Sequence, residues 1–419
     1  MSQPYISLVH QINPSNAQHS ALALAEANFL KEVITPVAHN LGSPIWWYLN
    51  LLPKNVHLYI TNELNRRSWL DLNGVPIRTY PWQEIIRILL LRTRLDKYSG
   101  FSHSQLGDWV NISLDAQVRK HHLKGLNAIY AYEDVAASTF EKAKQEGILC
   151  LYDLPITFYK MTHRIMSEEA ERFPDLAIAI ESLQDPAWKL ERKEREVKLA
   201  DHIFVASSVT KQSLLDTGVA LDKISVIPYG APVETFQVQP KPDDNFRALY
   251  VGRVSPRKGI HYLLQAWQDL KLPHAELVLV GSNLFPVGWL EQYKDIYCHI
   301  PSVPHLLLNQ YYSSASVLVF PSLVEGFGLV ILEAMACGIP VITTPNTAGA
   351  DIITDGVEGF IVPIRNVEAL KEKLEWCYCH PQELATMGLA ARRKAEELNW
   401  SLYRQKLVSK VKDILANHN

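Results

Sequence analysis

The sequence predicts an α/β protein with two domains, each built on a parallel β-sheet that is covered by helices. Three observations lead to this fold class. The 419 residues are enough for two to three domains of about 150 residues each, and two is the simpler solution. Short β-branched or aromatic runs alternate with longer helical patterns, which is typical of βαβ units. A proline-rich stretch without helical periodicity, YGAPVETFQVQPKPDDNF (229–246), separates the two halves.

The expected strands are distributed over both halves of the chain. Ligands of open parallel sheets bind outside the carboxyl ends of the strands. Several of the runs end on Gly or Pro or are directly followed by Pro or Ser, so we expect functional residues directly after them. The runs are NVHLYI (55–60), NAIYAY (127–132), HIFVA (202–206), KISVIP (223–228), RALYVG (247–252), AELVLVG (275–281), SVLVF (316–320) and IPVITT (339–344).

The linker predicts an N-terminal domain over residues 1–235 and a C-terminal domain over residues 240–395. The remaining residues, 396–419, contain an amphipathic segment, SLYRQKLVSKVKDIL (401–415). Its apolar residues recur on one helical face, and that face needs a surface to cover it. These residues are Leu402, Leu407, Val408, Val411 and Leu415.

Charge and cysteine content narrow the function classes. The chain has 41 basic and 44 acidic residues, a net charge of −3, and no long run of one sign, which argues against a nucleic-acid partner. Its five cysteines form no C-x-x-C pair and its first residues lack the pattern of a secretory leader. We therefore expect a protein of the reducing cytoplasm. The apolar stretches all fall short of 18 residues, so no membrane-spanning helix is expected.

The segment PWQEIIRILLLRTRLDKY (81–98) is apolar around much of a helix, with basic residues interleaved. Such a helix could lie in a membrane interface. It could equally be buried, with arginines that extend their charged ends to solvent. We favour the buried helix and keep a peripheral contact with the inner face of the membrane as the alternative.

The richest motif is FPSLVEGFGLVILEAMACGIPVITTP (320–345). It predicts a strand end, a glycine turn, a helix from about Gly328 to Cys337 and a new strand after Pro340. Free N–H groups at the start of such a helix suit a phosphate or an anionic leaving group. Glu325 and Glu333 would repel that phosphate, so their natural partners are the hydroxyls of a ribose or a hexose. Taken one at a time, the glycines and glutamates could equally form an ordinary turn and helix start.

A second motif, LYVGRVSPRKGIHYLLQAW (249–267), has a strand that ends at Gly252 and a helix that opens after Lys258. Between them Arg253 supplies a planar fork and Lys258 a point charge, so the pair can neutralise a diphosphate. Surface cations in a turn are more often only solvated.

Together the two motifs resemble the E-x7-E and G-R-x4-K-G patterns of retaining GT-B glycosyltransferases of family four, the group 1 glycosyltransferases. This family includes sucrose-phosphate synthases, lipopolysaccharide glucosyltransferases and phosphatidylinositol mannosyltransferases. The resemblance covers residues 200–400. It implies two Rossmann-like domains that face a central cleft, with the C-terminal helix crossing back to the N-terminal domain.

The resemblance also implies the reaction: transfer of a sugar from a UDP- or GDP-sugar to a hydroxyl acceptor, in the synthesis of a polysaccharide, a glycolipid or a small glycoside. Arg253, Lys258 and Glu325 would be the catalytic residues. Arg253 and Lys258 would grip the diphosphate, Glu325 the hydroxyls of the donor sugar and Glu333 those of the ribose. The other expected donor-binding residues are Gly252, Ser302, Val303, Gly326, Phe327, Gly328 and Leu329.

The N-terminal half departs from the family pattern. Ser15 and Asn16 stand where many members have glycines that contact the donor phosphates. Many members also place a histidine after a strand in the middle of this domain. Here GILCLYDLPITFYKMTHRIMSEEAERFP (147–174) offers Asp153 in a loop and His163 in a predicted helix. We keep these four as candidate residues of the cleft, although His163 fits an ordinary helix-face histidine better.

No D-x-D and no His or Cys pattern of metal spacing occurs in the chain, so we expect no metal and no cofactor beyond the nucleotide-sugar co-substrate. A sugar-nucleotide epimerase and a non-catalytic sugar-nucleotide-binding subunit of the same fold are the alternatives. A binding subunit is expected to lose one of the four charged motif residues, and all four are present. The sequence fixes neither the nucleobase, the sugar, the acceptor nor the oligomeric state.

Overall fold

The computed structural model describes residues 4–12, 14–38, 67–93 and 102–418. They form two compact units. The first unit comprises residues 1–154, 187–204 and 404–419, and the second comprises residues 155–186 and 205–403. The division therefore does not follow the expected boundary between residues 235 and 240, because residues 155–186 and 205–235 cluster with the second unit.

Within the described residues, the first sheet has seven strands in the order β3-β2-β1-β4-β5-β6-β7. Neighbours β2 and β3, β1 and β2, β1 and β4, and β4 and β5 all pair in parallel. Apolar residues of the central strands are buried, as expected where helices cover both faces. The strands are β1 (Ile6–Val9), β2 (Leu30–Thr35), β3 (Ile77–Thr79), β4 (Ala128–Tyr132), β5 (Leu149–Leu154), β6 (His202–Val205) and β7 (Ile224–Val226).

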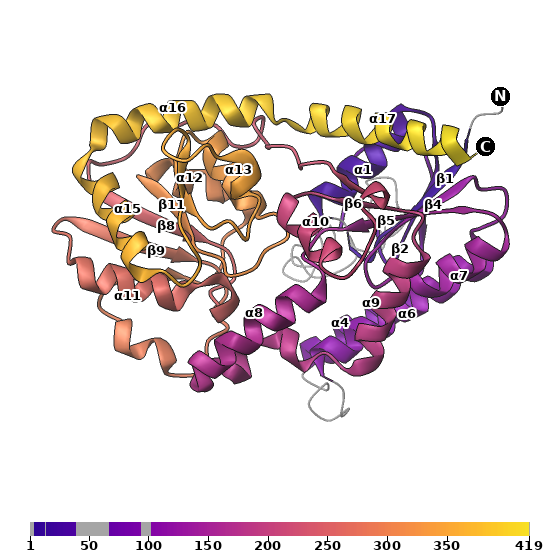
Figure 1. The fold of residues 1–419 in the computed structure, drawn as a ribbon, viewed down its shortest axis with the longest axis horizontal. Helices are drawn as coiled ribbons and strands as arrows, with labels where there is room; N and C mark the ends of the chain where they lie inside the picture. The colour runs from indigo at the N-terminus through magenta and orange to yellow at the C-terminus, as the bar shows by residue number, and fades with distance from the viewer. Residues whose placement is uncertain (1–3, 13, 39–66, 94–101, 419) are drawn as a thin grey trace, which may run out of the picture. The chain divides into compact units, whose positions relative to one another are not determined.

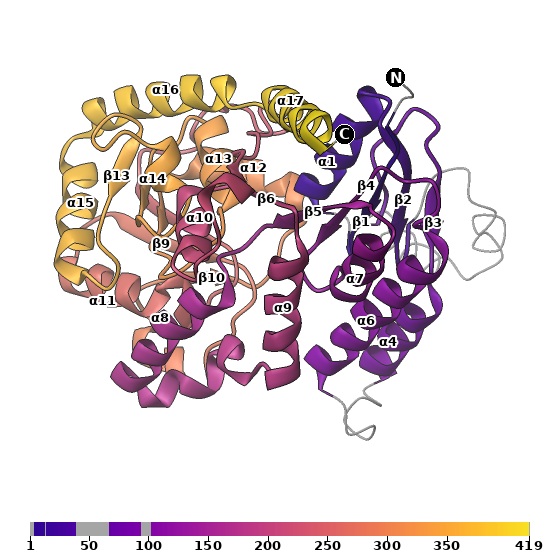
Figure 2. The same cartoon turned by 45° about the vertical axis from the view of Figure 1, so that its right-hand side comes forward.

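Helices cover this sheet in two groups, which Figure 2 shows. On one side α6 packs against both α4 and α7, and α7 packs against α9; on the other side lie α1 and α17. The helices are α1 (Ser15–Glu26), α4 (Trp82–Thr93), α6 (His103–His121), α7 (Ala137–Gln145), α9 (Ala187–Leu199) and α17 (Trp400–His418).

The last helix, α17, returns to the first unit as the resemblance implied, since residues 404–419 belong to that unit. Its Arg404 donates a hydrogen bond to Glu26 of α1 at 3.0 Å. Leu407, Val411 and Leu415 of the predicted apolar face are buried, which accounts for the amphipathic pattern.

The apolar face of helix α4 is exposed, whereas the favoured interpretation of the sequence was a buried helix. Its apolar residues Trp82, Ile85, Ile86 and Leu89 are 40% to 73% exposed. Their spacing of i, i+3, i+4 and i+7 places them on one helical face. The buried residue of this helix is instead Glu84, whose carboxylate accepts hydrogen bonds from Arg87 of the same helix and from Arg67. The prediction of a buried apolar helix is therefore wrong for this stripe.

The second sheet has six strands in the order β10-β9-β8-β11-β12-β13, all paired in parallel. In Figure 1 its strands lie between α11 and α15 on one side and α12 and α13 on the other. The strands are β8 (Phe246–Val251), β9 (Ala275–Val280), β10 (Cys298–Ile300), β11 (Val317–Phe320), β12 (Val341–Thr343) and β13 (Gly359–Ile361). The α-helices of the unit are α8 (Tyr159–Arg172), α10 (Ser208–Leu215), α11 (Ile260–Leu270), α12 (Leu308–Ser314), α13 (Leu329–Ala336), α14 (Gly349–Ile352), α15 (Val367–Cys379) and α16 (Pro381–Glu397).

Most of the predicted strands are present. The runs at 127–132, 202–206, 223–228, 247–252, 275–281, 316–320 and 339–344 each overlap a strand. The run NVHLYI (55–60) lies outside the described residues. None of the eight runs covers β1, β2, β3, β5, β10 or β13; β2 has the polar Lys31 and Glu32 within it, so its apolar pattern is interrupted.

The predicted linker, residues 229–246, is irregular but packed. Ala231 N–H donates to the carbonyl of Leu398 at 2.6 Å, and Phe236 is fully buried. The segment is therefore part of the second unit, not an exposed tether.

Candidate active site

The candidate site lies at the topological switch point of the second sheet. The strand order reverses between β8 and β11, because the chain builds outward from β8 in one direction and from β11 in the other. In open α/β sheets the crevice outside the carboxyl ends of these two strands is the usual ligand site. The two predicted motifs follow β8 and β11 directly, so the fold brings them together.

The loop after β8 is shaped by two glycines with positive φ. Gly252 has φ +137° and Gly259 has φ +71°. A Cβ at Gly259 would lie 2.1 Å from the carbonyl oxygen of Pro321, the first residue after β11, so only glycine allows the two loops to approach this closely. Between the glycines a short 3-10 helix, Pro256–Lys258, carries Lys258 inward, where it is only 8% exposed.

The loop after β11 holds Glu325 and leads into helix α13. Gly328 is the N-cap residue of α13, with φ +85° and no side-chain hydrogen bond to the first helical N–H groups. These N–H groups can therefore donate to an anion. Gly326 is held from the other side, because Ser207 and Thr210 both donate hydrogen bonds to its carbonyl.

Three charged side chains meet in this site. The ammonium group of Lys258 forms an ion pair with Glu325, and Arg257 Nη1 lies 3.2 Å from the same carboxylate oxygen. Burial lowers the pKa of Lys258 to about 8, against the opposing effect of Glu325. The pKa of Glu325 falls to about 2, because the attraction of Lys258 and Arg257 outweighs burial. The cluster carries a net charge of about +1 at neutral pH.

Glu333 is held by two residues that the sequence analysis did not identify. His305 Nε2 donates to one carboxylate oxygen at 2.9 Å, and Tyr312 Oη donates to the other at 2.8 Å. The hydrogen bond to Glu333 raises the pKa of His305, partly opposed by burial. The sequence analysis also did not select Arg257, although its position next to Lys258 was a signal for it. His305 and Tyr312 belong to no motif, so the sequence contained no signal that could have identified them.

The remaining C-terminal candidates lie around this centre. Arg253 is 56% exposed and its closest carboxylate is that of Glu181 at 3.5 Å, so its side chain is accessible to a ligand. Ser302 is exposed and Val303 half-buried, both in the segment between β10 and α12.

Phe327 is buried, and its ring packs against that of Tyr229 at 4.9 Å between centroids, which makes it a structural support of the loop. Leu329 is the first residue of α13.

Of the N-terminal candidates, Asn16 and Asp153 are buried in the first unit and Ser15 is exposed there. Burial raises the pKa of Asp153 to about 7, and Tyr130 donates a hydrogen bond to it at 2.6 Å. His163 is half-buried on α8 of the second unit, with its ring edge-on to Tyr159.

The first unit has a switch point of its own between β1 and β4, and His10 follows β1 there. Burial lowers the pKa of His10 to about 3, and its ring lies 4.2 Å from that of Tyr132 at the end of β4. The sequence analysis did not select His10, although its place directly after a strand was the available signal.

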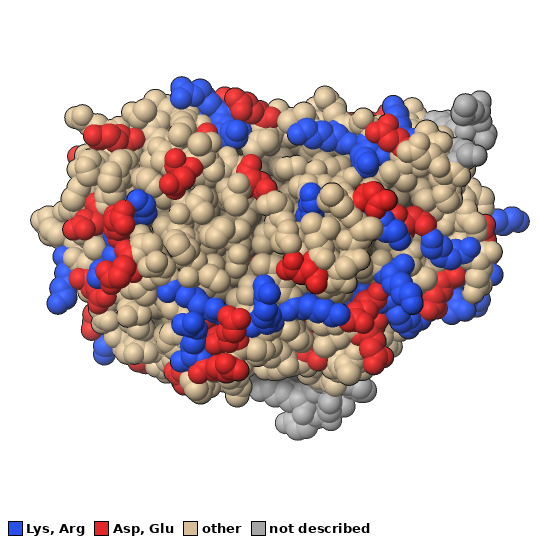
Figure 3. All heavy atoms as spheres, in the orientation of Figure 1, with Lys and Arg blue, Asp and Glu red and all other residues tan. Residues whose placement is uncertain are grey.

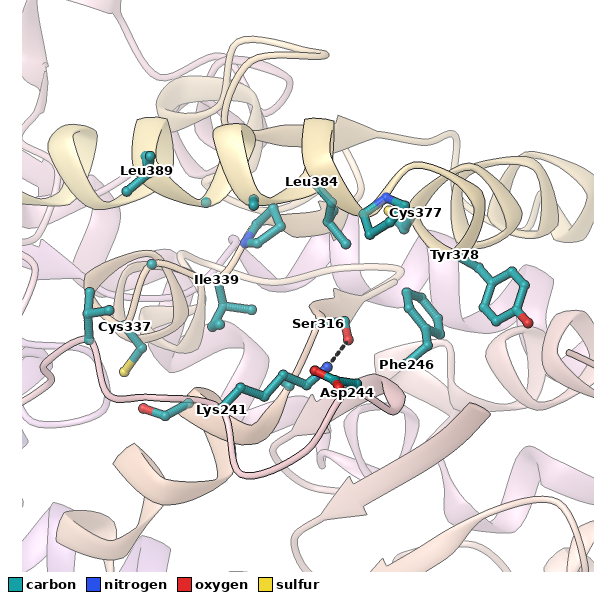
Figure 4. Close-up of a pocket in the computed structure, with 18 of the residues that line it drawn as sticks. Lys241, Asp244, Phe246, Ser316, Cys337, Ile339, Cys377, Tyr378, Leu384 and Leu389 are labelled. Atoms are coloured by element: carbon teal, nitrogen blue, oxygen red, sulfur yellow. Dashed lines mark hydrogen bonds between the residues drawn. The ribbon is translucent and has the colours of Figure 1, made fainter. Parts of the chain in front are cut away.

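A separate cavity of about 600 Å³ lies in the second unit. It is shown in Figure 4, where Ile339 and Leu384 point into it and Lys241 donates a hydrogen bond to Ser316. Its lining includes Phe246, at the amino end of β8, and Pro340, directly before β12. The cavity therefore lies at the sheet edge opposite to the candidate site and is not part of it.

Among the described residues, no group of three or more His, Cys, Asp or Glu side chains has the geometry of a metal site. Within the same residues no helix is long and apolar enough to cross a membrane. On the face shown in Figure 3, basic and acidic side chains are interspersed and neither sign forms a continuous field.

The family comparison concerns the part of the second unit that carries the six-stranded sheet. Residues 233–394 match the model of the glycosyl transferases group 1 family. This stretch belongs to the group 1 glycosyl transferases. The matched residues contain both motifs, so Lys258, Glu325 and Glu333 all lie within the matched stretch.

Several relatives match the chain over more residues than this stretch contains. The capsular polysaccharide biosynthesis glycosyltransferase CapM of Staphylococcus aureus is 31% identical over 47% of this chain and 57% of its own length. A D-inositol 3-phosphate glycosyltransferase of Kribbella flavida is 25% identical over 65% of this chain and 70% of its own. For CapM and for the corresponding Paenarthrobacter aurescens and Streptosporangium roseum enzymes, the match spans 57% to 62% of the relative's length.

Solved structures extend the similarity to both units. Sucrose-phosphate synthase from Thermosynechococcus elongatus has a TM-score of 0.67 at 20% identity, covering 99% of this chain and all of that one. Anabaena HepE in complex with UDP-glucose has a TM-score of 0.61 at 16% identity, covering 98% and 99%. With two parallel Rossmann-like sheets and a returning C-terminal helix, the chain has the predicted GT-B fold.

Proposed function

We propose that the chain transfers a sugar from a nucleoside-diphosphate sugar to a hydroxyl acceptor, with retention at the anomeric carbon. The observation that carries the proposal is the cluster of Lys258, Arg257 and Glu325 at the switch point of the group 1 domain. The bond from the anomeric carbon to the diphosphate breaks and a bond to the acceptor oxygen forms on the same face. The diphosphate gains negative charge as it leaves, so preorganised positive charge lowers the barrier.

Each residue then has a role that its surroundings support. Lys258 and Arg253 bind the diphosphate, and the free N–H groups at the start of α13 add to this anion site. Glu325 is ionised at any physiological pH because of its lowered pKa, so it can accept hydrogen bonds from the sugar hydroxyls. Glu333 accepts hydrogen bonds from the ribose. All of these groups come from the protein, and we propose that transfer needs no metal.

A panel of nucleoside diphosphates tests donor binding. UDP and GDP and their sugars are added to the purified chain, and the melting temperature is measured; a ligand at a hundred times its Kd stabilises by about 2.7 kcal/mol. Lys258→Ala is expected to lose the shift. Transfer to an acceptor separates an enzyme from a binding subunit, and the anomeric coupling constant of the product in NMR separates retention from inversion. A chain that binds no nucleoside diphosphate contradicts the proposal.

We propose further that the chain is cytoplasmic and touches the inner membrane face through α4. The five cysteines are all free, as expected in a reducing compartment. The exposed stripe of α4 has the composition of an interfacial helix, with Trp82 73% exposed at its start. Residues 82–98 contain four basic and two acidic side chains, which favours an anionic lipid surface.

Sedimentation with vesicles tests this contact. The full chain is expected to bind vesicles that contain anionic lipid better than neutral ones, and the double variant Ile85→Ser, Ile86→Ser is expected to lose binding. Leu389→Ser is a matched control, because Leu389 is an exposed leucine of the second unit. Equal binding of the wild type and the double variant overturns the membrane contact and leaves the transferase proposal untouched.

A further inference from the structure

The carboxylate of Glu333 is buried but only partly satisfied. Its side chain is 8% exposed, and its two hydrogen bonds come from His305 and Tyr312. An ionised carboxylate has about four acceptor positions. Within the described residues, no lysine or arginine forms an ion pair with it. Buried polar groups are normally satisfied, and one that keeps open acceptor positions is a signal of a ligand.

The two donors are arranged so that each carboxylate oxygen has one partner. His305 reaches one oxygen and Tyr312 the other, which fixes the plane of the carboxylate. Each oxygen keeps about one further acceptor position. Two neighbouring hydroxyls, as in the cis-diol of a ribose, match two such positions side by side. A single hydroxyl would use only one of them.

A buried aromatic ring holds both donors in place. Phe236 is fully buried; its ring packs edge-on against His305 at 5.2 Å and against Tyr312 at 5.6 Å between centroids. The two donors also come from one continuous piece of chain, because His305 begins the turn that leads into α12 and Tyr312 lies on that helix. Their rings therefore move with the same element.

We infer that His305 and Tyr312 are positioning residues that orient the Glu333 carboxylate for the ribose diol of the donor, and so set the preference for ribose over 2′-deoxyribose. The inference rests on the proposed function, because it needs a nucleotide at this site. It adds two residues that act through Glu333 and lie outside both sequence motifs.

Calorimetry with UDP and 2′-deoxy-UDP, or with GDP and 2′-deoxy-GDP if guanosine is the base, tests the inference. The wild type is expected to prefer the ribonucleotide. Tyr312→Phe keeps the ring against Phe236 and removes one donor, and His305→Ala removes the other. Each is expected to weaken ribonucleotide binding about tenfold, as for loss of a hydrogen bond to a charged group, and to change 2′-deoxynucleotide binding much less.

Two further variants separate positioning from simple loss of structure. His305→Gln can still donate to Glu333 and is expected to restore most of the preference. His418→Ala, an exposed histidine near the end of α17, is the matched control. Equal weakening of both nucleotides in Tyr312→Phe and His305→Ala overturns the inference, as does an unchanged preference. If the wild type binds no nucleoside diphosphate at all, that result contradicts the proposed function, and the inference, which rests on it, is contradicted as well.

Discussion

The pH dependence of transfer tests the anion site most directly. A single buried amine, that of Lys258, should determine how the rate falls at alkaline pH. Burial lowers the pKa of Lys258 from 10.5 to about 8, and the charged form is the one that binds a diphosphate. The profile of kcat/KM reports the pKa values of the free enzyme. With a pKa of about 8, roughly nine tenths of Lys258 is charged at pH 7 and roughly one tenth at pH 9. We expect kcat/KM to fall about tenfold over this interval.

Two substitutions assign the fall to Lys258. Lys258→Arg keeps a positive charge throughout, because the guanidinium does not deprotonate in this range, so the fall between pH 7 and pH 9 should disappear even if the rate is lower. Lys258→Ala removes the charge and should lower turnover about a hundredfold or more, a barrier increase of roughly 3 kcal/mol. Lys241→Ala is the control, because burial also lowers the pKa of Lys241 but this residue lines the separate cavity.

The assay is the initial rate with donor below its KM and saturating acceptor, at pH values from about 6.5 to 9.5 in a constant-ionic-strength buffer. Glu325 does not contribute to this side of the profile, since the pKa of its carboxyl is about 2. An alkaline fall that persists unchanged in Lys258→Arg would show that another group titrates. Near-normal turnover in Lys258→Ala would refute the diphosphate assignment itself.

Three further predictions concern the same site. Gly326→Ala should weaken nucleotide binding by at least about tenfold in calorimetry, because the new Cβ would lie 2.1 Å from the Pro155 carbonyl oxygen. Gly107→Ala is the control and should leave nucleotide binding unchanged, because its Cβ meets nothing within 4 Å. Glu333→Ala should mainly raise the donor KM and Glu325→Ala mainly lower kcat, since ribose contacts are similar in ground and transition states; the reverse pattern in steady-state kinetics would exchange their roles. Transfer in excess EDTA should keep at least about a third of its rate, and complete loss that manganese restores would contradict metal independence.

The sequence was sufficient to predict those elements that are determined by residues close together along the chain. The runs before Gly252 and Gly281 are buried strands of the second sheet, because β-branched residues bounded by glycine leave few other conformations. The start of α13 was predicted within one residue, at Gly328 against Leu329 in the structure. Glycine turns and helix starts are local features, so the motifs could be placed without knowledge of the packing.

What the sequence could not show depends on contacts between distant segments. His305 and Glu333 are 28 positions apart, and Arg257 and Glu325 are 68 apart, so no local pattern predicts either pair. Glu169 of α8 accepts hydrogen bonds from His261 and Arg365 of the second unit. These buried bonds help to hold α8 with that unit, although the chain order had suggested the N-terminal domain.

The charge balance of the site explains why it suits a nucleotide sugar better than either of its parts. A neutral sugar would gain little from Lys258 and Arg257, and a bare phosphate would be repelled by Glu325. Glu325 neutralises part of the positive charge through its ion pair with Lys258, which limits the cost of burying the amine. A donor that brings a diphosphate and hydroxyls together can take over both halves of this pair, the diphosphate pairing with Lys258 and the hydroxyls with Glu325. The ion pair therefore selects for ligands that carry both groups a few bonds apart.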